Sequence, residues 1–165
     1  MSAAIILAMV TAQRLAELWL SARNTRRLLG LGAKEYGRSH YPLIVAVHAT
    51  WLAALWWLAP GRPIYWFPLI LFLLLQLARL WVIRSLGARW TTRIIVLPGQ
   101  PLVRRGPYRW LDHPNYLIVA LEIALLPLAF GLVGTALLFS LLNAAVLAIR
   151  IRSENKALAL SAPRP

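Results

Sequence analysis

Long apolar runs, separated by short polar stretches, make up most of this chain. A helix that crosses about 30 Å of hydrocarbon needs about 20 mostly apolar residues, and five runs come near that length. The pattern therefore predicts five membrane-spanning helices, at residues 3–20, 42–59, 64–83, 114–130 and 132–151. Pro60-Gly61-Arg62-Pro63 has the composition of a tight turn. Gly131 and Gly134 separate the last two runs, which we expect to form a helical hairpin.

The spans lie so close together that they leave no room for a separate soluble catalytic domain. We expect an all-α integral membrane protein with one domain over residues 1–165, made of three N-terminal spans (1–83) and a core of one connector and two spans (84–160). The connector, residues 84–113, is long enough to be functional. Its β-branched run at 91–96 and the following Pro98-Gly99 predict an extended segment and then a turn. Any active site must use this connector and the helix ends.

Basic residues determine the expected orientation. Five lie in residues 21–41, six in residues 84–113 and four from residue 150 onward. With five spans, these three regions fall on one side of the membrane, which the positive-inside rule makes cytoplasmic. The N-terminus is then outside and the C-terminus inside. The basic residues concerned are Arg23, Arg26, Arg27, Lys34, Arg38, Arg84, Arg89, Arg93, Arg104, Arg105, Arg109, Arg150, Arg152, Lys156 and Arg164.

The overall composition also indicates a membrane protein. Of the 165 residues, 60% are hydrophobic and only 14% are charged. The net charge of +13 comes from clusters between apolar runs, which suit anionic lipid headgroups, so we expect no nucleic-acid partner. Cysteine is absent and His40, His48 and His113 are dispersed, which argues against a metal site. The first run lacks a signal-peptide pattern, so we expect it to be a retained helix. The 16 arginines against two lysines indicate a GC-rich bacterial genome, so we expect the protein in a bacterial plasma membrane.

Several polar side chains lie inside the expected spans, where each is costly unless it is paired or hydrated. Arg14 and Glu17 are three residues apart on one helix face, so we expect them to neutralise each other. Glu122 lies deep in the fourth span, and a buried partner such as Arg79 or His48 is favoured over a catalytic role. The whole set is Gln13, Arg14, Glu17, His48, Gln76, Arg79, Glu122 and Asn143.

Two short segments near the expected cytoplasmic face contain most of the candidate functional side chains. The first, residues 106–116, reads Gly-Pro-Tyr-Arg-Trp-Leu-Asp-His-Pro-Asn-Tyr. Pro114 can begin the fourth span and leave free backbone N–H groups for a ligand, with His113 beside them. The second segment, residues 150–154, reads Arg-Ile-Arg-Ser-Glu and places Arg150 and Glu154 on one helix face. These two residues form either an ordinary ion pair or two separate charges that hold ligands.

The connector adds Pro-Leu-Val at 101–103 to Gly-Pro-Tyr-Arg at 106–109 and His-Pro-Asn-Tyr at 113–116. Together with Arg-Ile-Arg-Ser-Glu, this combination resembles the isoprenylcysteine carboxyl methyltransferase family over approximately residues 84–160. The first half, with Gly-Ala-Lys-Glu-Tyr-Gly at 32–37, is more similar to the short bacterial branch of that family. Some members of this branch O-methylate long-chain alkylpyrones.

The resemblance implies an O-methyltransferase that uses S-adenosyl-L-methionine and faces the cytoplasm. It implies that Glu154 holds the cofactor's amino group and that Arg150 is the catalytic residue facing the acceptor. Asp112 stands where the family usually has arginine, and Asn155 stands where the family often has a second acid. Glu154 is therefore the only carboxylate in its segment. The implied cofactor-binding residues are Gln100, Pro101, Leu102, Val103, Tyr108, His113, Pro114, Asn115, Tyr116 and Glu154.

The implied chemistry suits a site with few polar groups. S-adenosylmethionine carries its own leaving group, so the site mainly has to hold the acceptor oxygen in line with the methyl. Arg150 can orient an ionised carboxylate or acidic hydroxyl. An alkylpyrone, a prenylcysteine and a phospholipid amine all remain open as lipophilic or prenylated acceptors. Membrane lipids are the other expected partners. Two other functions also remain open: an NADPH-dependent reductase of the sterol-reductase type, and a non-catalytic scaffold that binds headgroups.

Overall fold

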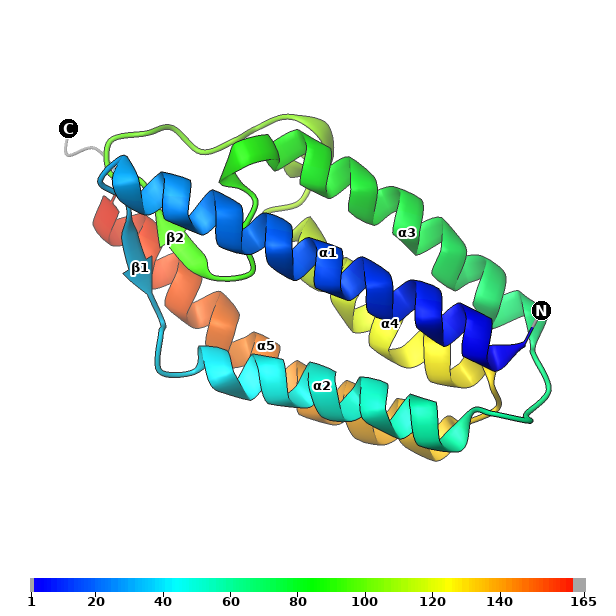
Figure 1. Cartoon of the computed structure of the whole chain (residues 1–165). Coiled ribbons are helices and arrows are strands. Elements are labelled where there is room, and N and C mark those ends of the chain that lie inside the picture. Colours follow the sequence, from blue (N-terminus) through cyan, green and yellow to red (C-terminus); the bar gives the residue numbers. More distant parts are fainter. Residues whose placement is uncertain (1, 162–165) are drawn as a thin grey trace.

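Five helices make up most of the computed structural model, which describes residues 2–161 (Figure 1). Each predicted span corresponds to one helix, so the prediction of a helical fold is confirmed. Two short 3-10 helices, η1 (Gly87–Arg89) and η2 (Gly106–Arg109), lie in the connector before the fourth helix. The five helices are α1 (Ala3–Gly30), α2 (Tyr41–Leu58), α3 (Trp66–Leu86), α4 (Pro114–Ala129) and α5 (Val133–Ser161).

Four of the described helices are long and apolar enough to cross a membrane: α1, α2, α3 together with η1, and α5. The fourth predicted span, α4, has only 16 residues. The chain is therefore an integral membrane protein. Five complete spans remain a prediction.

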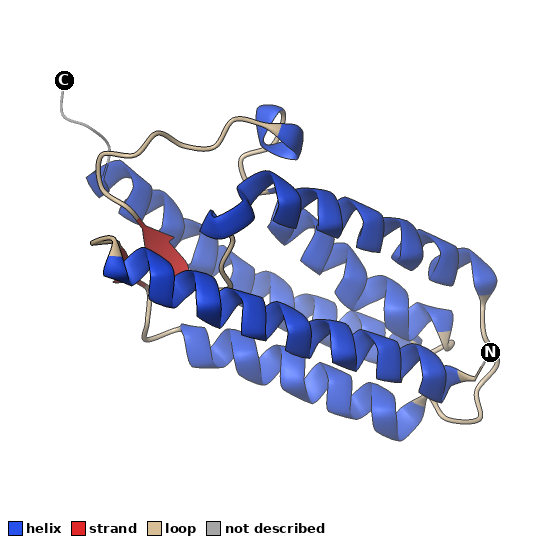
Figure 2. Cartoon of the chain, turned by 45° about the horizontal axis from the view of Figure 1, so that its top comes forward, coloured by secondary structure: helices blue, strands red, loops and turns tan. Residues whose placement is uncertain are grey.

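The short helix α4 lies in the interior of the bundle, as Figures 1 and 2 show from two directions. Its Ile123 and Leu126 are buried in one hydrophobic cluster with Leu7 of α1, Trp51 of α2 and Phe72 of α3. The Trp51 indole N–H donates to the Ile123 carbonyl at 3.2 Å. Helices α3 and α5 pack against α4 and fix its position, while Leu117 and Leu121 stay exposed.

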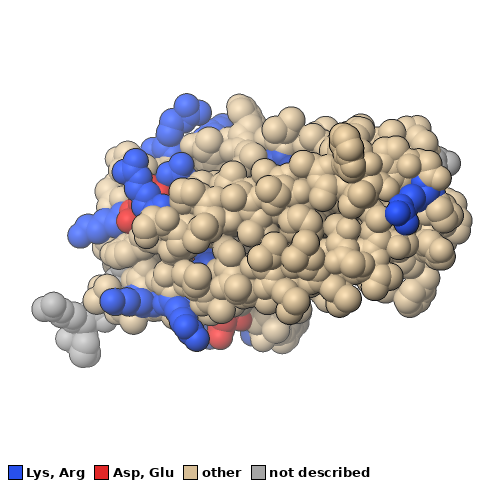
Figure 3. All heavy atoms as spheres, turned by 90° about the horizontal axis from the view of Figure 1, so that it is seen from below, with Lys and Arg blue, Asp and Glu red and all other residues tan. Residues whose placement is uncertain are grey.

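Successive helices run in opposite directions, so their connections alternate between the two ends of the bundle (Figure 1). We call one of these ends the basic end; it holds residues 31–40, residues 84–113 and the last turns of α5. Figure 3 shows that Lys and Arg side chains gather mainly at one end of the molecule. Arg164 lies outside the described residues. This grouping supports the predicted orientation, which stays a prediction.

The two predicted breaks at the opposite end are present. Residues 59–65 form the turn between α2 and α3. Gly131 separates α4 from α5 and has a φ of +68°, a conformation that favours glycine. Gly134, which we expected to belong to the break, lies inside α5. The last two helices thus form the expected hairpin.

A small antiparallel pair of strands crosses the basic end. β1 (Lys34–Tyr36) pairs with β2 (Ile94–Val96), with Lys34 opposite Val96. The predicted extended segment is therefore confirmed at 94–96, and Gly99, with a φ of +73°, lies in the predicted turn. The sequence pattern gave no indication of β1. This pair ties the connector to the chain after α1.

Four charged side chains meet between α1, α3 and α4, and we call them the buried charge cluster. Arg79 binds Glu17 (Nε to Oε1, 2.6 Å) and Glu122 (Nη1 to Oε2, 2.8 Å). Arg14 binds the same two carboxylates at 3.0 and 2.7 Å. The expected pairing of Arg14 with Glu17 and of Glu122 with Arg79 is thus confirmed. His48, the other expected partner of Glu122, instead bonds a carbonyl oxygen of its own helix.

Candidate active site

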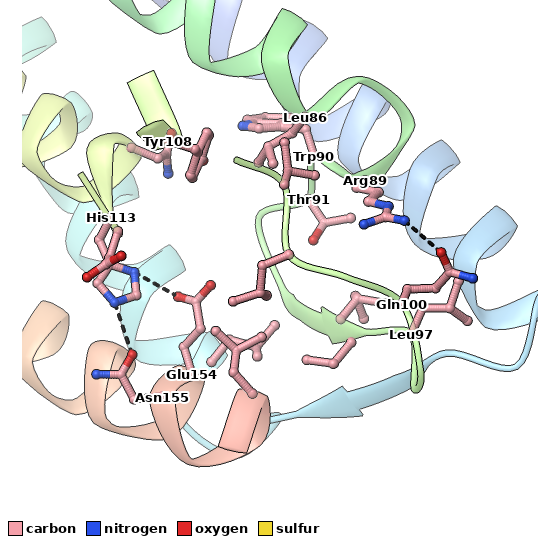
Figure 4. Close-up of a pocket in the computed structure, with 18 of the residues that line it drawn as sticks. Leu86, Arg89, Trp90, Thr91, Leu97, Gln100, Tyr108, His113, Glu154 and Asn155 are labelled. Atoms are coloured by element: carbon pink, nitrogen blue, oxygen red, sulfur yellow. Dashed lines mark hydrogen bonds and ion pairs between the residues drawn. The ribbon is translucent and has the colours of Figure 1, made fainter. Parts of the chain in front are cut away.

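A cavity of about 460 Å³ opens at the basic end, inside the range of about 300–1,000 Å³ typical of small-molecule sites (Figure 4). The connector forms most of its wall, including η1, β2 and η2. The first turn of α4 and the last turns of α5 complete it. The two motif segments therefore form one part of the wall, and the connector before them forms most of the rest.

The first turn of α4 positions His113 and Tyr116. Pro114 begins the helix and is buried, and His113 stands immediately before it. The His113 ring stacks on the Tyr116 ring, with centroids 5.3 Å apart. His113 Nε2 lies 3.0 Å from Asn155 Oδ1, and His113 Nδ1 lies 3.7 Å from Glu154 Oε2 (Figure 4). Two segments about 40 residues apart in sequence therefore meet side by side.

The Tyr116 hydroxyl lies between Arg150 and Glu154. It donates to Glu154 Oε2 and accepts from Arg150 Nε at 2.8 Å. Arg150 also donates from Nη2 to the Thr92 carbonyl at 2.7 Å and lies over the Tyr116 ring. The two charged groups form no direct ion pair in the described chain, so the simple interfacial pair that we considered is not what the structure shows. A tyrosine separates the positive group from the negative one.

The structure brings nearly all of the predicted site residues together. Pro114 is the exception, because it is buried behind the cavity wall and does not line it. Asp112, the departure noted at the cavity mouth, lines the cavity as well, so Glu154 is not the only carboxylate there. The predicted residues that line the cavity are Gln100, Pro101, Leu102, Val103, Tyr108, His113, Asn115, Tyr116, Arg150 and Glu154.

Comparison with known proteins shows which family this site belongs to. Residues 68–160 match the isoprenylcysteine carboxyl methyltransferase family, which is more than half of the chain. The chain belongs to this family. An uncharacterized protein of Bacillus subtilis, YpbQ, is 42% identical over 93% of this chain and 95% of its own length. An uncharacterized protein of Haemophilus influenzae is 26% identical over 97% of this chain and 96% of its own.

No solved structure matches the chain. Membership of the isoprenylcysteine carboxyl methyltransferase family supports a methyltransferase that acts on a lipid-like acceptor. Enzymes of this family use S-adenosylmethionine in general. The geometry of the site is therefore best compared with the needs of that cofactor.

Two residues that no motif singled out fix the cavity wall of this family member, one in the connector and one in α1. Arg89 donates to the Pro101 carbonyl at 2.8 Å and to Gln100 Oε1 at 3.0 Å (Figure 4). Asn24 of α1 donates to the Trp90 carbonyl at 2.8 Å. The sequence carried only a weak signal for these contacts, because most of them end on backbone carbonyls.

Unpaired polar atoms in the wall fit a nucleoside-bearing ligand. Asn115 Oδ1 and Trp90 Nε1 are buried without a hydrogen-bond partner in the described part of the chain, and both residues line the cavity. Buried polar groups are usually hydrogen-bonded, so an unpaired acceptor and an unpaired donor indicate ligand contacts. Burial raises the pKa of the Tyr108 hydroxyl, and the Glu154 carboxylate raises it further, so Tyr108 stays a neutral donor.

Asn155 orients the His113 side chain. Its Oδ1 faces His113 Nε2 at 3.0 Å. The amide thereby fixes the orientation of the imidazole without adding charge. The His113 ring thereby keeps its orientation in the stack on Tyr116.

Proposed function

We propose that this protein transfers a methyl group from S-adenosyl-L-methionine to an oxygen of a lipophilic acceptor, a carboxylate or an acidic hydroxyl. One observation carries the proposal: His113, Tyr116, Arg150 and Glu154 converge in a single cavity at the basic end of a membrane-embedded bundle. The whole chain acts as one domain, with its cavity facing the cytoplasm of a bacterial cell. An alkylpyrone hydroxyl and a prenylcysteine carboxylate are both acceptors of this kind.

The residues that would hold the cofactor lie on three sides of the cavity. Glu154 would accept from the amino group, since charge-assisted hydrogen bonds are the stronger ones. Asn115 would use its unpaired Oδ1 and Tyr108 its hydroxyl proton. Residues 100–103 would cover the remaining face, because Arg89 fixes the backbone there. When bound, the cofactor supplies an electrophilic methyl with its own leaving group.

Arg150 is placed to orient the acceptor. Its Nε and Nη2 are engaged by Tyr116 and Thr92, and its Nη1 has no partner among residues 2–161. The side chain is therefore held rigidly with one donor group free. An acceptor oxygen that is already ionised needs no general base, so holding and desolvating it in line are the main requirements. The apolar part of the acceptor remains in the bilayer beside the bundle.

Ligand binding distinguishes this proposal from the reductase and the scaffold. Detergent-solubilised protein should bind S-adenosylhomocysteine saturably at one site in calorimetry, and the ligand should raise the melting temperature. NADPH should do neither. Stabilisation by NADPH alone would favour a reductase, and no response to either ligand would favour the scaffold.

A further inference from the structure

A second cavity, of about 300 Å³, lies at the basic end against α1 and the start of α2. Apart from Arg93, the residues that line it do not line the first cavity, and none is among the proposed cofactor-binding residues. Thr92 lies in the wall between the two cavities, because its carbonyl holds Arg150 and its side chain lines the second cavity. The lining residues are Leu18, Ser21, Ala22, Thr25, Arg26, Tyr41, Thr92 and Arg93.

Thr25 carries an unused buried hydroxyl in this cavity. The residue is only 8% exposed, and its Oγ1 has no hydrogen-bond partner among residues 2–161. Buried or helical threonines usually donate to the carbonyl four residues earlier, as Thr11 and Thr50 do here, both at 2.7 Å. Thr25 does not make this bond. Its hydroxyl is therefore an unpaired polar group in the cavity wall.

The other polar groups around the cavity favour an anion. Ser21 Oγ and the Tyr41 hydroxyl both lie within hydrogen-bond distance of Thr92 Oγ1, at 2.8 and 3.1 Å. Arg26 is exposed and forms no ion pair within the described part of the chain. Arg93 lies over the Tyr41 ring and shares its charge with Glu35 of β1 at 2.8 Å. The cavity thus combines hydroxyl groups with one unpaired and one paired guanidinium, and no carboxylate lines it.

We propose that this cavity binds the anionic phosphate headgroup of a membrane phospholipid. The headgroup would accept from Thr25 and Arg26, and the acyl chains would lie along α1, where Leu15 and Leu18 are 62% and 45% exposed. Basic clusters at a membrane surface attract anionic lipids. Free phosphate offers the same headgroup chemistry but has no chains for this apolar face. The proposal does not depend on methyl transfer.

Lipid binding to the full chain in a neutral detergent tests the site. We expect native mass spectrometry to show one phosphatidylglycerol bound more tightly than phosphatidylcholine. Arg26→Gln and Thr25→Val should each weaken phosphatidylglycerol binding by about tenfold, since each removes one hydrogen bond to a charged group. Arg27→Gln is the matched control, because this neighbouring arginine is exposed and does not line the cavity.

Two further variants separate a ligand contact from a structural role. Thr25→Val removes an unpaired hydroxyl, so the lipid-free variant should melt no lower than the natural protein, and Thr25→Ser should retain lipid binding. The proposal is overturned if phosphatidylcholine binds as tightly as phosphatidylglycerol, or if Arg27→Gln weakens binding as much as Arg26→Gln. Displacement of phosphatidylglycerol by an equal concentration of inorganic phosphate would also overturn it, because the site would then take the free anion.

Discussion

Replacing Glu154 with glutamine is expected to weaken S-adenosylhomocysteine binding by about ten- to a hundredfold. Glu154 supplies the carboxylate beside His113 and Tyr116, and the ligand keeps the amino group that this carboxylate would hold. Glutamine has nearly the same shape and can still accept from Tyr116. The loss should therefore appear in the dissociation constant measured by calorimetry, with little change in melting temperature.

Glu35→Gln is the matched control for that measurement. Glu35 lies in β1 at the same end of the bundle but binds Arg93 and does not line the cofactor cavity. Its replacement should change the dissociation constant by less than about twofold, because it breaks only a partly exposed ion pair outside the cavity. Such pairs contribute little energy. Equal binding by the Glu154→Gln variant and the natural protein would exclude Glu154 from the cofactor site.

Replacing Arg79 with methionine is expected to lower the free energy of unfolding by about 3–5 kcal/mol. Arg79 binds Glu17 and Glu122 in the buried charge cluster, and its removal leaves two buried carboxylates with one arginine. An unpaired charge lowers the stability of the fold far more when it is buried than when it is exposed. Unfolding in a mixed-detergent titration, followed by tryptophan fluorescence, measures the change.

A charge-balanced variant identifies the cause of that loss. Adding Glu17→Gln to Arg79→Met restores one positive and one negative charge, so the double variant should recover about 1–3 kcal/mol. The exposed Arg62, which caps α2, serves as the surface control, and Arg62→Met should cost at most about 0.5 kcal/mol. A loss below about 1 kcal/mol for Arg79→Met would show that the cluster is hydrated or unnecessary for stability.

The lengths of the apolar runs predicted the five helices, but they did not predict where α1 and α5 end. α1 continues to Gly30, beyond the predicted end at residue 20, because its last turns are held by polar contacts with the connector. Asn24, for example, binds the Trp90 carbonyl, and Ser21 accepts from the Thr92 amide. Hydropathy detects burial in lipid, whereas these contacts depend on a partner about 70 residues away. β1 was missed for the same reason.

The candidate site was predicted from motifs, and its geometry adds the links between them. Local patterns indicated His113 and Glu154, but they did not indicate that the Tyr116 hydroxyl separates Glu154 from Arg150. Thr92 was missed because it binds Arg150 through its backbone carbonyl, and Arg89 because it binds the backbone carbonyl of Pro101. Any residue type supplies a carbonyl, so such contacts leave no pattern in the sequence. Pro114 was assigned to the cofactor from its place in a motif, whereas its packing shows that it starts α4 behind the wall.

Transfer of a labelled methyl group tests the proposed activity most directly. The natural protein, supplied with methyl-labelled S-adenosylmethionine and a lipid extract of its host, should place the label in an organic-soluble lipid as an oxygen-linked methyl. Arg150→Lys should still bind S-adenosylhomocysteine but transfer label at least about tenfold more slowly, because the contacts to Tyr116 and Thr92 are lost. Label in no lipid at all, from protein that binds S-adenosylhomocysteine, would contradict the proposed methyl transfer to a lipophilic acceptor.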